Sequence, residues 1–418
     1  MTYRKRFQIS LALAFVLGCG VGYLGVAPSP VQAADAAKNS VSRKFAKPFQ
    51  DAQAAMTAKN YDAAIQVLRS NVESATDRTP YDTFVMNQLL GLSLAQSKQN
   101  AAAIPYLEGM VGSGFLEPSD AQLYSREIVK LYYGEKDYAK AAEAGHKLIE
   151  AGTANDDVYV VVAQAEFLQK NFPAVATVLG PYVKQATSAG GKPPEPVLQL
   201  LSESYIRQND MASAAGPLRL LVTHYPSPQH WSNLLTIQRV GAGSDVALLN
   251  VYRLMHAVGA LTEPNDVSEM VELAIKLGSP GEALTVLQEA MAKDVFKTDS
   301  AKKSAEGRLQ RVTTLSATDK GGLASFEKEA SAAKTGEGDV RLGQALLSYG
   351  QADKAIDALK RGIGKGSLRN PDEAQILLGM ALLKAGRKDD AIVAFNGAKG
   401  ADPKLTDIAG LWALHARS

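Results

Sequence analysis

The stretch at residues 370–403, NPDEAQILLGMALLKAGRKDDAIVAFNGAKGADP, decides the fold because it carries the start and stop signals of two short helices. Asn370 is the predicted N-cap, Pro371 follows at the first helical position, and two acidic residues occupy the first turn, where backbone amides are unpaired. Gly386 is predicted to end this helix in the left-handed conformation. A second helix starts near Lys388, so the stretch predicts a helical hairpin.

The second helix is predicted to end at Gly400 and Pro403, and both helices mix small residues with large apolar ones. Small side chains let two helices approach, and large ones fill the space between them, so that the hairpin buries one face. The positions that make up this pattern are Gly379, Leu382, Ala391, Phe395 and Ala398, with Pro403 after them.

Similar patterns recur along the chain when the Ala391 position is used as the reference. Segments such as KNYDAAIQVL at residues 59–68 and EKDYAKAAEA at residues 135–144 share a polar turn, an aromatic residue, and a small residue three positions later. The mean spacing is about 36 residues, which predicts a solenoid of about ten helix-turn-helix hairpins. The reference positions are Ala64, Ala103, Ala141, Val175, Ala214, Leu248, Ala283, Leu323, Ala355 and Ala391.

The order of small, aromatic, Ala, aromatic, Ala and Pro positions in residues 370–403 resembles the tetratricopeptide repeat family. The resemblance covers nearly the whole chain after about Phe45 and is strongest in the last two hairpins. It implies an all-α superhelix whose first helices line a concave groove that binds peptides or partner helices. The groove candidates that it implies are Arg126, Lys130, Tyr133, Gln164, Phe167, Gln199, Glu203, Asn233 and Gln344.

The predicted layout groups the repeats in three blocks. Residues 46–185 hold repeats 1–4, residues 196–297 hold repeats 5–7, and residues 298–418 hold repeats 8–10 with a C-terminal capping helix. The Gly- and Pro-rich connection at residues 186–196 is expected to project between the fourth and fifth hairpins. The eighth repeat, centred on Leu323, is weakly patterned and is either a distorted hairpin or a hinge.

Residues 1–33 have the three parts of a secretory signal: a basic start, an apolar run and a small-residue site that predicts cleavage after Ala33. Residues 34–45 would then form a disordered lead. Two alternatives stay open, an uncleaved membrane anchor and a lipoprotein attached through Cys19. All three place the repeats outside the cytoplasm, with periplasmic export expected, and allow membrane contact only through an uncleaved or lipidated N-terminus.

Composition and motifs argue against nucleic-acid binding, metal binding and catalysis. Export without residues 1–33 leaves 42 Lys and Arg against 43 Asp and Glu, so no basic footprint for nucleic acid remains. The single cysteine, Cys19, lies in the signal, and the five histidines do not form an H-E-x-x-H pattern. We therefore expect no catalytic site, no metal, no cofactor and no small-molecule substrate.

The function expected from these observations is a non-catalytic scaffold that binds protein partners or peptide segments in the bacterial cell envelope. The general pattern also resembles exported repeat proteins that accompany TonB-type energy-transducing systems. One alternative is an enzyme that remodels peptidoglycan, or its accessory subunit, since some transglycosylases are built on helical superhelices. A lipoprotein that assembles at the outer membrane is a further alternative.

Overall fold

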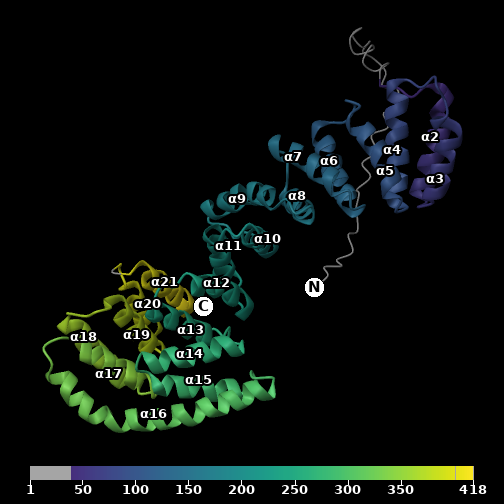
Figure 1. Ribbon diagram of the computed structural model, residues 1–418. Helices are drawn as coiled ribbons and strands as arrows, with labels where there is room; N and C mark the ends of the chain where they lie inside the picture. The colour runs from purple at the N-terminus through teal and green to yellow at the C-terminus, as the bar shows by residue number, and fades with distance from the viewer. Residues whose placement is uncertain (1–38, 401, 418) are drawn as a thin grey trace. The chain divides into compact units, whose positions relative to one another are not determined.

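The computed structural model describes residues 39–400 and 402–417, and these fall into two compact units, one ending at Glu135 and one beginning at Lys136. The predicted signal, Cys19 and the lead up to residue 38 lie outside the described residues. Every regular element in the described ranges is helical, which confirms the predicted all-α solenoid (Figure 1). The grouping of the repeats into three blocks stays a prediction.

The first unit runs from α2 to α6. Its helices are α2 (Arg43–Thr57), α3 (Tyr61–Leu68), the π-helical turn η1 (Arg69–Glu73), α4 (Pro80–Gln96), α5 (Asn100–Val111) and α6 (Pro118–Gly134).

The second unit runs from α7 to α21. Its helices are α7 (Tyr138–Glu150), α8 (Asp156–Leu168), α9 (Phe172–Ser188), α10 (Glu195–Arg207), α11 (Met211–His224), α12 (Pro228–Val240), α13 (Asp245–Ala257), α14 (Pro264–Lys276), α15 (Pro280–Ala292), α16 (Asp299–Ala332), α17 (Glu337–Ser348), α18 (Ala352–Lys365), α19 (Pro371–Lys384), α20 (Lys388–Asn396) and α21 (Pro403–Arg417).

The turns inside the hairpins share one backbone conformation. A residue with positive φ ends the first helix, and the next residue is the N-cap of the second. In the last hairpin Gly386 has φ 76°, as predicted, and the amide of Arg387 donates to the carbonyl of Leu382 at 2.9 Å. This bond pairs a helix-end carbonyl that would otherwise lack a partner. Five hairpins use a non-glycine residue instead: Lys59, Lys98, Lys136, Lys170 and Asn209.

The reference positions of the sequence lie four residues after these N-caps, in the contact between the helices. Eight of the ten have no exposed surface: Ala64, Ala103, Ala141, Val175, Ala214, Ala283, Ala355 and Ala391. Leu248 is half-buried, and its neighbour Ala247 is the fully buried residue there. Leu323 lies in the middle of α16, outside any hairpin turn.

The eighth repeat differs from both alternatives that the sequence left open. Residues 299–332 form one helix of 34 residues, α16, which packs on α15 and α17 (Figure 1). The segment has no proline and is rich in Ala, Lys and Glu, which favour helix. Only Ala305, Val312, Ser316 and Ala330 are buried along it, so its apolar pattern is too sparse to show a hairpin period.

Three predicted boundaries are wrong. Residues 43–45 were predicted to belong to a disordered lead, but they form the start of α2, and Phe45 is buried. The connection at 186–196 is shorter, since α9 extends to Ser188 and α10 starts at Glu195. It is also held in place, because the Tyr225 hydroxyl donates to the carbonyl of Pro193 at 3.0 Å.

The ends of the deciding hairpin also differ in detail from the prediction. The second helix, α20, ends at Asn396 rather than at Gly400, and Pro403 starts α21 instead of only stopping α20. Asn370 occupies the N-cap of α19, but its side chain makes no capping hydrogen bond.

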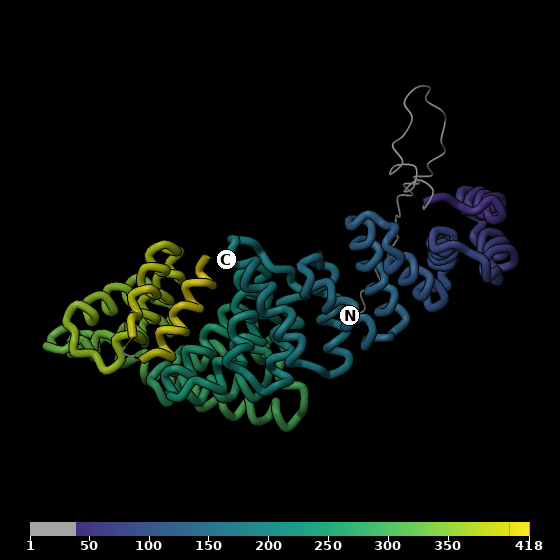
Figure 2. The backbone as a smooth tube through the Cα atoms, turned by 90° about the horizontal axis from the view of Figure 1, so that it is seen from above, coloured from purple at the N-terminus to yellow at the C-terminus, as the bar shows by residue number. Residues whose placement is uncertain are grey.

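The C-terminal helix α21 does more than cover the last hairpin. It contacts α19 and α20 and also α13, about 150 residues earlier in the chain. An ion pair joins Arg219 to Asp407 at 2.5 Å, and the rings of Trp231 and His415 meet edge to face at 6.2 Å. Figures 1 and 2 both show the yellow C-terminal helix beside the teal helices of this unit. The second half of the unit therefore closes on itself.

Candidate binding cavity

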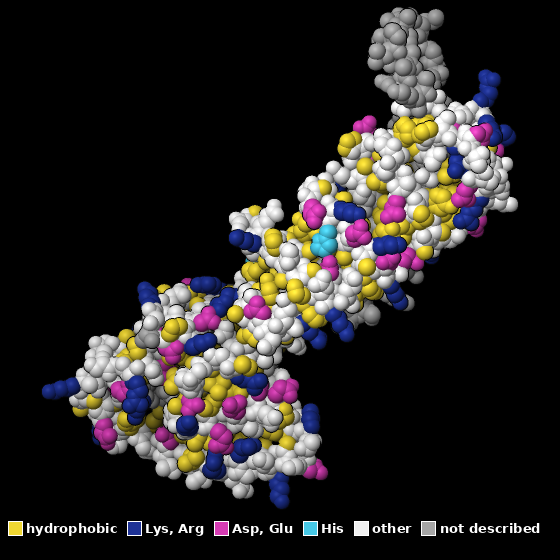
Figure 3. Space-filling view, turned by 45° about the horizontal axis from the view of Figure 1, so that its top comes forward, with side chains coloured by type: hydrophobic (Ala, Val, Ile, Leu, Met, Phe, Trp, Pro, Cys, Tyr) yellow, Lys and Arg dark blue, Asp and Glu magenta, His cyan; other side chains and the backbone are white. Residues whose placement is uncertain are grey.

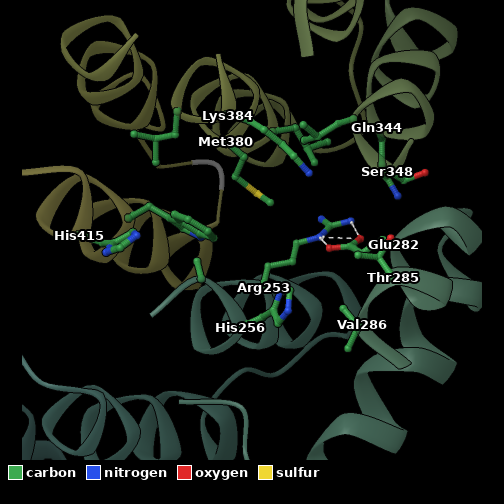
Figure 4. A pocket seen from close by; sticks show the side chains of 15 residues that line it. Arg253, His256, Glu282, Thr285, Val286, Gln344, Ser348, Met380, Lys384 and His415 are labelled. Atoms are coloured by element: carbon green, nitrogen blue, oxygen red, sulfur yellow. Dashed lines mark hydrogen bonds and ion pairs between the residues drawn. The ribbon is translucent and has the colours of Figure 1, made fainter. Parts of the chain in front are cut away.

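The closed part of the second unit holds a cavity of about 330 Å³, which is open to solvent where the lining residues Thr285 and Lys384 are exposed. Its walls come from α13, α15, α17, α19 and α21, which form the inner layer (Figure 4). Within this layer α15 contacts α17, α17 contacts α19, α19 contacts α21, and α21 contacts α13. The size falls within the range of ordinary ligand pockets.

The single helix α16 explains which helices form this layer. Before it, α13 and α15 are the second helices of their hairpins, whereas after it α17 and α19 are first helices. Inner and outer helices alternate along a solenoid. Because α16 has no hairpin partner, the inner helix is the second helix of each hairpin before α16 and the first helix of each hairpin after it. The implied rule that first helices line the groove therefore fails for α13 and α15.

An ion pair between Arg253 of α13 and Glu282 of α15 forms the polar floor of the cavity (Figure 4). The guanidinium binds the carboxylate at both ends, with Nε–Oε1 at 2.9 Å and Nη2–Oε2 at 2.8 Å. The Arg253 side chain is 2% exposed. Burial alone would lower the pKa of Arg253, but the charge and hydrogen bonds of Glu282 outweigh burial and raise it. Arg253 therefore stays charged.

Neutral side chains extend the floor to α17. Gln344 of α17 donates from Nε2 to the Leu277 carbonyl at 2.9 Å and to Ser279 Oγ at 2.7 Å. Arg253 Nη1 donates to Asn250 Oδ1 at 3.3 Å. Arg253 Nη2 also donates to Ser279 Oγ at 3.4 Å, so Ser279 joins α13 and α17 to the start of α15 and holds the floor in place.

A carboxyl group from α19, Glu373, lies near this floor. Burial raises the pKa of Glu373, and the charge of Glu337 adds to the rise. The charge of Arg253 and hydrogen bonds from Asn370 and Asn250 act in the opposite direction without cancelling it. Glu373 thus gains a proton more readily than an exposed glutamate.

Basic side chains complete the polar lining. Lys384, at the end of α19, makes no ion pair or hydrogen bond with any residue that the structure describes. His256 of α13 lies 3.0 Å from Glu289, measured from Nε2 to Oε2. Burial, followed by the charge of Lys388, lowers the pKa of His415. The lining thus holds one unmatched permanent positive charge.

Apolar side chains cover the remaining wall. They are Ala257, Val286, Leu347, Leu377, Met380, Leu383 and Trp412. Met380 points toward Arg253 in Figure 4. Trp412 is 3% exposed, stacks on Phe395 at 5.7 Å, and its buried Nε1–H finds no acceptor among the residues described. The cavity thus offers a polar floor beside an apolar wall.

The predicted groove residues do not meet at one site. Of the nine, only Gln344 lines this cavity, and none of the other eight lines the second cavity, which lies between α14 and α16. Several make local contacts: Glu203 pairs with Arg207 at 2.7 Å, and Phe167 packs on Phe172 at 5.2 Å. Arg126, Lys130 and Tyr133 lie on α6 in the first unit. Their binding role stays a prediction.

Sequence reasoning missed Arg253, Glu282 and Lys384. One signal was present, because Arg253 interrupts the apolar run VALLNVYRLM of α13 and a charge in such a run needs a partner. Nothing in the sequence paired it with Glu282, which is 29 residues away.

Neither a metal-ligand cluster nor a membrane-spanning helix is found in the part of the chain that the structure describes. No three His, Cys, Asp or Glu side chains there are grouped so as to hold a metal ion. No helix among those same residues is long and apolar enough to span a bilayer. On the face shown in Figure 3, acidic and basic side chains are interspersed.

The fold and the cavity define an α-solenoid of helical hairpins. A tetratricopeptide repeat model matches residues 340–405, which span most of α17 to the start of α21, so this part of the chain carries tetratricopeptide repeats. Repeats of this family imply a scaffold for protein–protein interaction, so protein partners are supported.

Solved structures of repeat proteins resemble the chain at low identity. A Parabacteroides merdae tetratricopeptide repeat protein is 7% identical, with 65% of this chain and 100% of that chain covered and a TM-score of 0.33. The C-terminal part of a repeat protein from Cytophaga hutchinsonii is 13% identical, with 61% and 98% covered and a TM-score of 0.36. The TPR2AB domain of yeast Sti1 in complex with pHSP90 is 12% identical, with 72% and 100% covered and a TM-score of 0.25. No curated protein sequence matches the chain significantly.

Proposed function

We propose that the protein is a non-catalytic scaffold that binds protein partners in the periplasm of a bacterial cell envelope. The observation that carries the binding role is the closed inner layer of the second unit, which holds a cavity with a polar floor and an apolar wall. A binding site of this kind needs no reacting group.

The envelope location rests on the sequence of residues 1–33, with its basic start, its apolar run and the small residues before Ala34. An accessory role beside a TonB-type system belongs to the same proposal and rests on the general sequence pattern alone.

Intact mass and fractionation test the location. A C-terminally tagged chain is produced in a Gram-negative host, and the released periplasmic fraction is weighed by mass spectrometry. We expect a protein that lacks residues 1–33. A diacylated Cys19 would instead support the assembly-lipoprotein alternative, and a full-length chain in the cytoplasm would refute export.

Cross-linking in the envelope tests the binding role. The tagged chain should capture the same partner in independent preparations, and TonB-type components among the captured proteins would support the accessory role. A chain that captures no partner reproducibly contradicts the scaffold. Release of fragments from peptidoglycan by the purified protein would favour the enzyme alternative.

A further inference from the structure

The contact that closes the second unit uses one face of α21. Asp407, Leu411 and His415 follow one another at intervals of four residues, so they share this face. Asp407 pairs with Arg219 of α11, and the ring of His415 meets Trp231 of α12. Leu411 lies between them on the helix and has no exposed surface. We call the contact of this face with α11, α12 and α13 the seam.

The charged contacts at the rim of the seam are open to water. Lys404, one turn before Asp407, lies with its Nζ 3.3 Å from the place of a Cβ at Gly241, the C-cap of α12, where a cation is favoured. The side chains of Arg219 and Asp407 are 38% and 39% exposed. Charge contacts with this exposure contribute little to stability, so the rim holds the seam weakly.

The other face of α21 is held by buried apolar contacts. Trp412 is 3% exposed and stacks on Phe395 of α20 at 5.7 Å. Ala416 follows one turn later on the same face and is 2% exposed. We therefore expect α21 to stay on α20 when the seam separates.

The remaining inner helices are able to follow such a movement. They contact one another in the order α15, α17, α19 and α21, and the seam joins the end of this row back to α13. In a solenoid each repeat contacts only its neighbours, so small rotations at successive interfaces add up along the row. The seam is thus able to separate without the loss of any hairpin.

We propose that the seam is a gate. The inner face of α21 separates reversibly from α11, α12 and α13, while its other face stays on α20, and the separation widens the cavity between α13 and α21. The inference goes beyond the scaffold role, because the gate belongs to the isolated chain and needs no partner.

Thiol labelling of the purified full chain tests the gate. Leu411→Cys places a thiol in the seam, Ala416→Cys places one on the α20 side, and Cys19→Ser in both leaves the introduced thiol alone. A buried thiol reacts with N-ethylmaleimide in proportion to the population in which it is exposed. After correction for the rate of the same thiol in urea, Leu411→Cys should react at least about tenfold faster than Ala416→Cys.

Charge variants show whether the seam controls this rate. Arg219→Glu faces its acidic partner with a like charge, so it should speed the labelling of Leu411→Cys at least about threefold and leave Ala416→Cys unchanged. Arg219→Lys keeps the charge and should stay within about twofold of the parent rate. Arg311→Glu disrupts a half-exposed pair with Glu272 that joins α14 to α16, and it should leave both rates unchanged.

Tryptophan fluorescence gives a second readout that leaves Leu411 intact. In Trp412→Phe the remaining indole is Trp231, which is 3% exposed and touches His415. Arg219→Glu should increase its quenching by acrylamide, whereas Arg311→Glu should not. This readout decides the matter if Leu411→Cys fails to fold, as judged by circular dichroism.

Two results would overturn the gate. Equal labelling of Leu411→Cys and Ala416→Cys would show that α21 leaves α20 as well. An Arg219→Glu variant that changes neither labelling nor quenching would show that the seam does not separate. Partner capture in the envelope is scored separately, so either result leaves the scaffold role to its own test.

Discussion

Arg253 and Glu282 lie 29 residues apart in sequence, yet the guanidinium of one binds both carboxylate oxygens of the other on the floor of the cavity. The Arg253 side chain is 2% exposed, so its charge depends on this partner. Glu282→Gln removes the negative charge and leaves a buried cation, which should lower the free energy of unfolding by about 3–5 kcal/mol.

Urea unfolding followed by tryptophan fluorescence measures this change, because both tryptophans belong to the second unit. Glu272→Gln is the control. Glu272 pairs with Arg311 at 2.5 Å, but the two side chains are 48% and 53% exposed, so the cost should stay below about 1 kcal/mol. An equal fall in the free energy of unfolding for the two variants would show that the burial of Arg253 does not cause the loss of stability.

Gly379 of α19 faces the ring of Phe395 of α20, and an added Cβ would overlap that ring. Phe395 is 1% exposed and stacks on Trp412, so it has little room to move. Gly379→Ala should therefore lower the free energy of unfolding by about 1–3 kcal/mol, despite the better helix propensity of Ala.

Gly410→Ala is the matched substitution. Gly410 lies in α21 with no atom near the position of an added Cβ, so Ala should raise stability by up to about 1 kcal/mol. Thermal unfolding of both variants distinguishes the effects by sign. A stabilised Gly379→Ala protein would mean that the two helices separate easily.

The hairpins could be predicted because their determinants are local. The turn, the N-cap and the small residue four positions later all lie within a few residues, as around Ala64 and Ala391. The same reasoning failed at α16, where few buried residues leave no period to detect.

The cavity could not be predicted from such local patterns. It exists because α21 returns to α13, and the Arg219–Asp407 pair that accompanies this return joins residues 188 positions apart. Repeat periodicity predicts contacts between successive hairpins and carries no signal for a contact that closes the chain on itself. Gln344, which was predicted for a groove, lines the cavity and also bonds to the loop before α15.

The turn between α4 and α5 contains Lys98 in a left-handed conformation, so replacing this lysine with glycine should stabilise the first unit. Lys98 has φ 65° and holds the same place in its hairpin as Gly386, which has φ 76°. A side chain in this conformation costs about 1–2 kcal/mol, part of which glycine loses again through its freer unfolded state. Lys98→Gly should therefore raise stability by up to about 1 kcal/mol.

The reverse change, Gly386→Lys, should lower stability by a similar amount. Hydrogen exchange of amides in α4 and α5 measures the first variant, and exchange in α19 and α20 the second. Identical exchange in Lys98→Gly and the parent protein would contradict a strained turn.

The buried carboxylate of Asp82 should make the free energy of unfolding of the first unit fall in acid. This carboxylate is fully buried and accepts from the amide and hydroxyl of Ser42 at 2.9 and 2.6 Å, and from those of Thr79 at 3.0 and 2.8 Å. These bonds join the start of α2 to the start of α4, and the Asp82 amide donates back to Thr79 Oγ1 at 3.1 Å. Asp82→Ala leaves several buried donors unpaired and should cost about 1–3 kcal/mol.

The pH dependence follows from the pKa of Asp82. Burial tends to raise it, but the hydrogen bonds from Ser42 and Thr79 outweigh burial and hold the pKa below its ordinary value of 3.8. The folded protein thus releases this proton more readily than the unfolded chain, so the stabilisation is complete above pH 3.8 and is lost as the pH falls through the folded-state pKa. Hydrogen exchange of α2 and α4, corrected for the intrinsic rate, should show Asp82→Asn less stable than the parent protein at pH 6. The difference should narrow below pH 3.8, and a difference that stays constant with pH would exclude the charge of Asp82 as its cause.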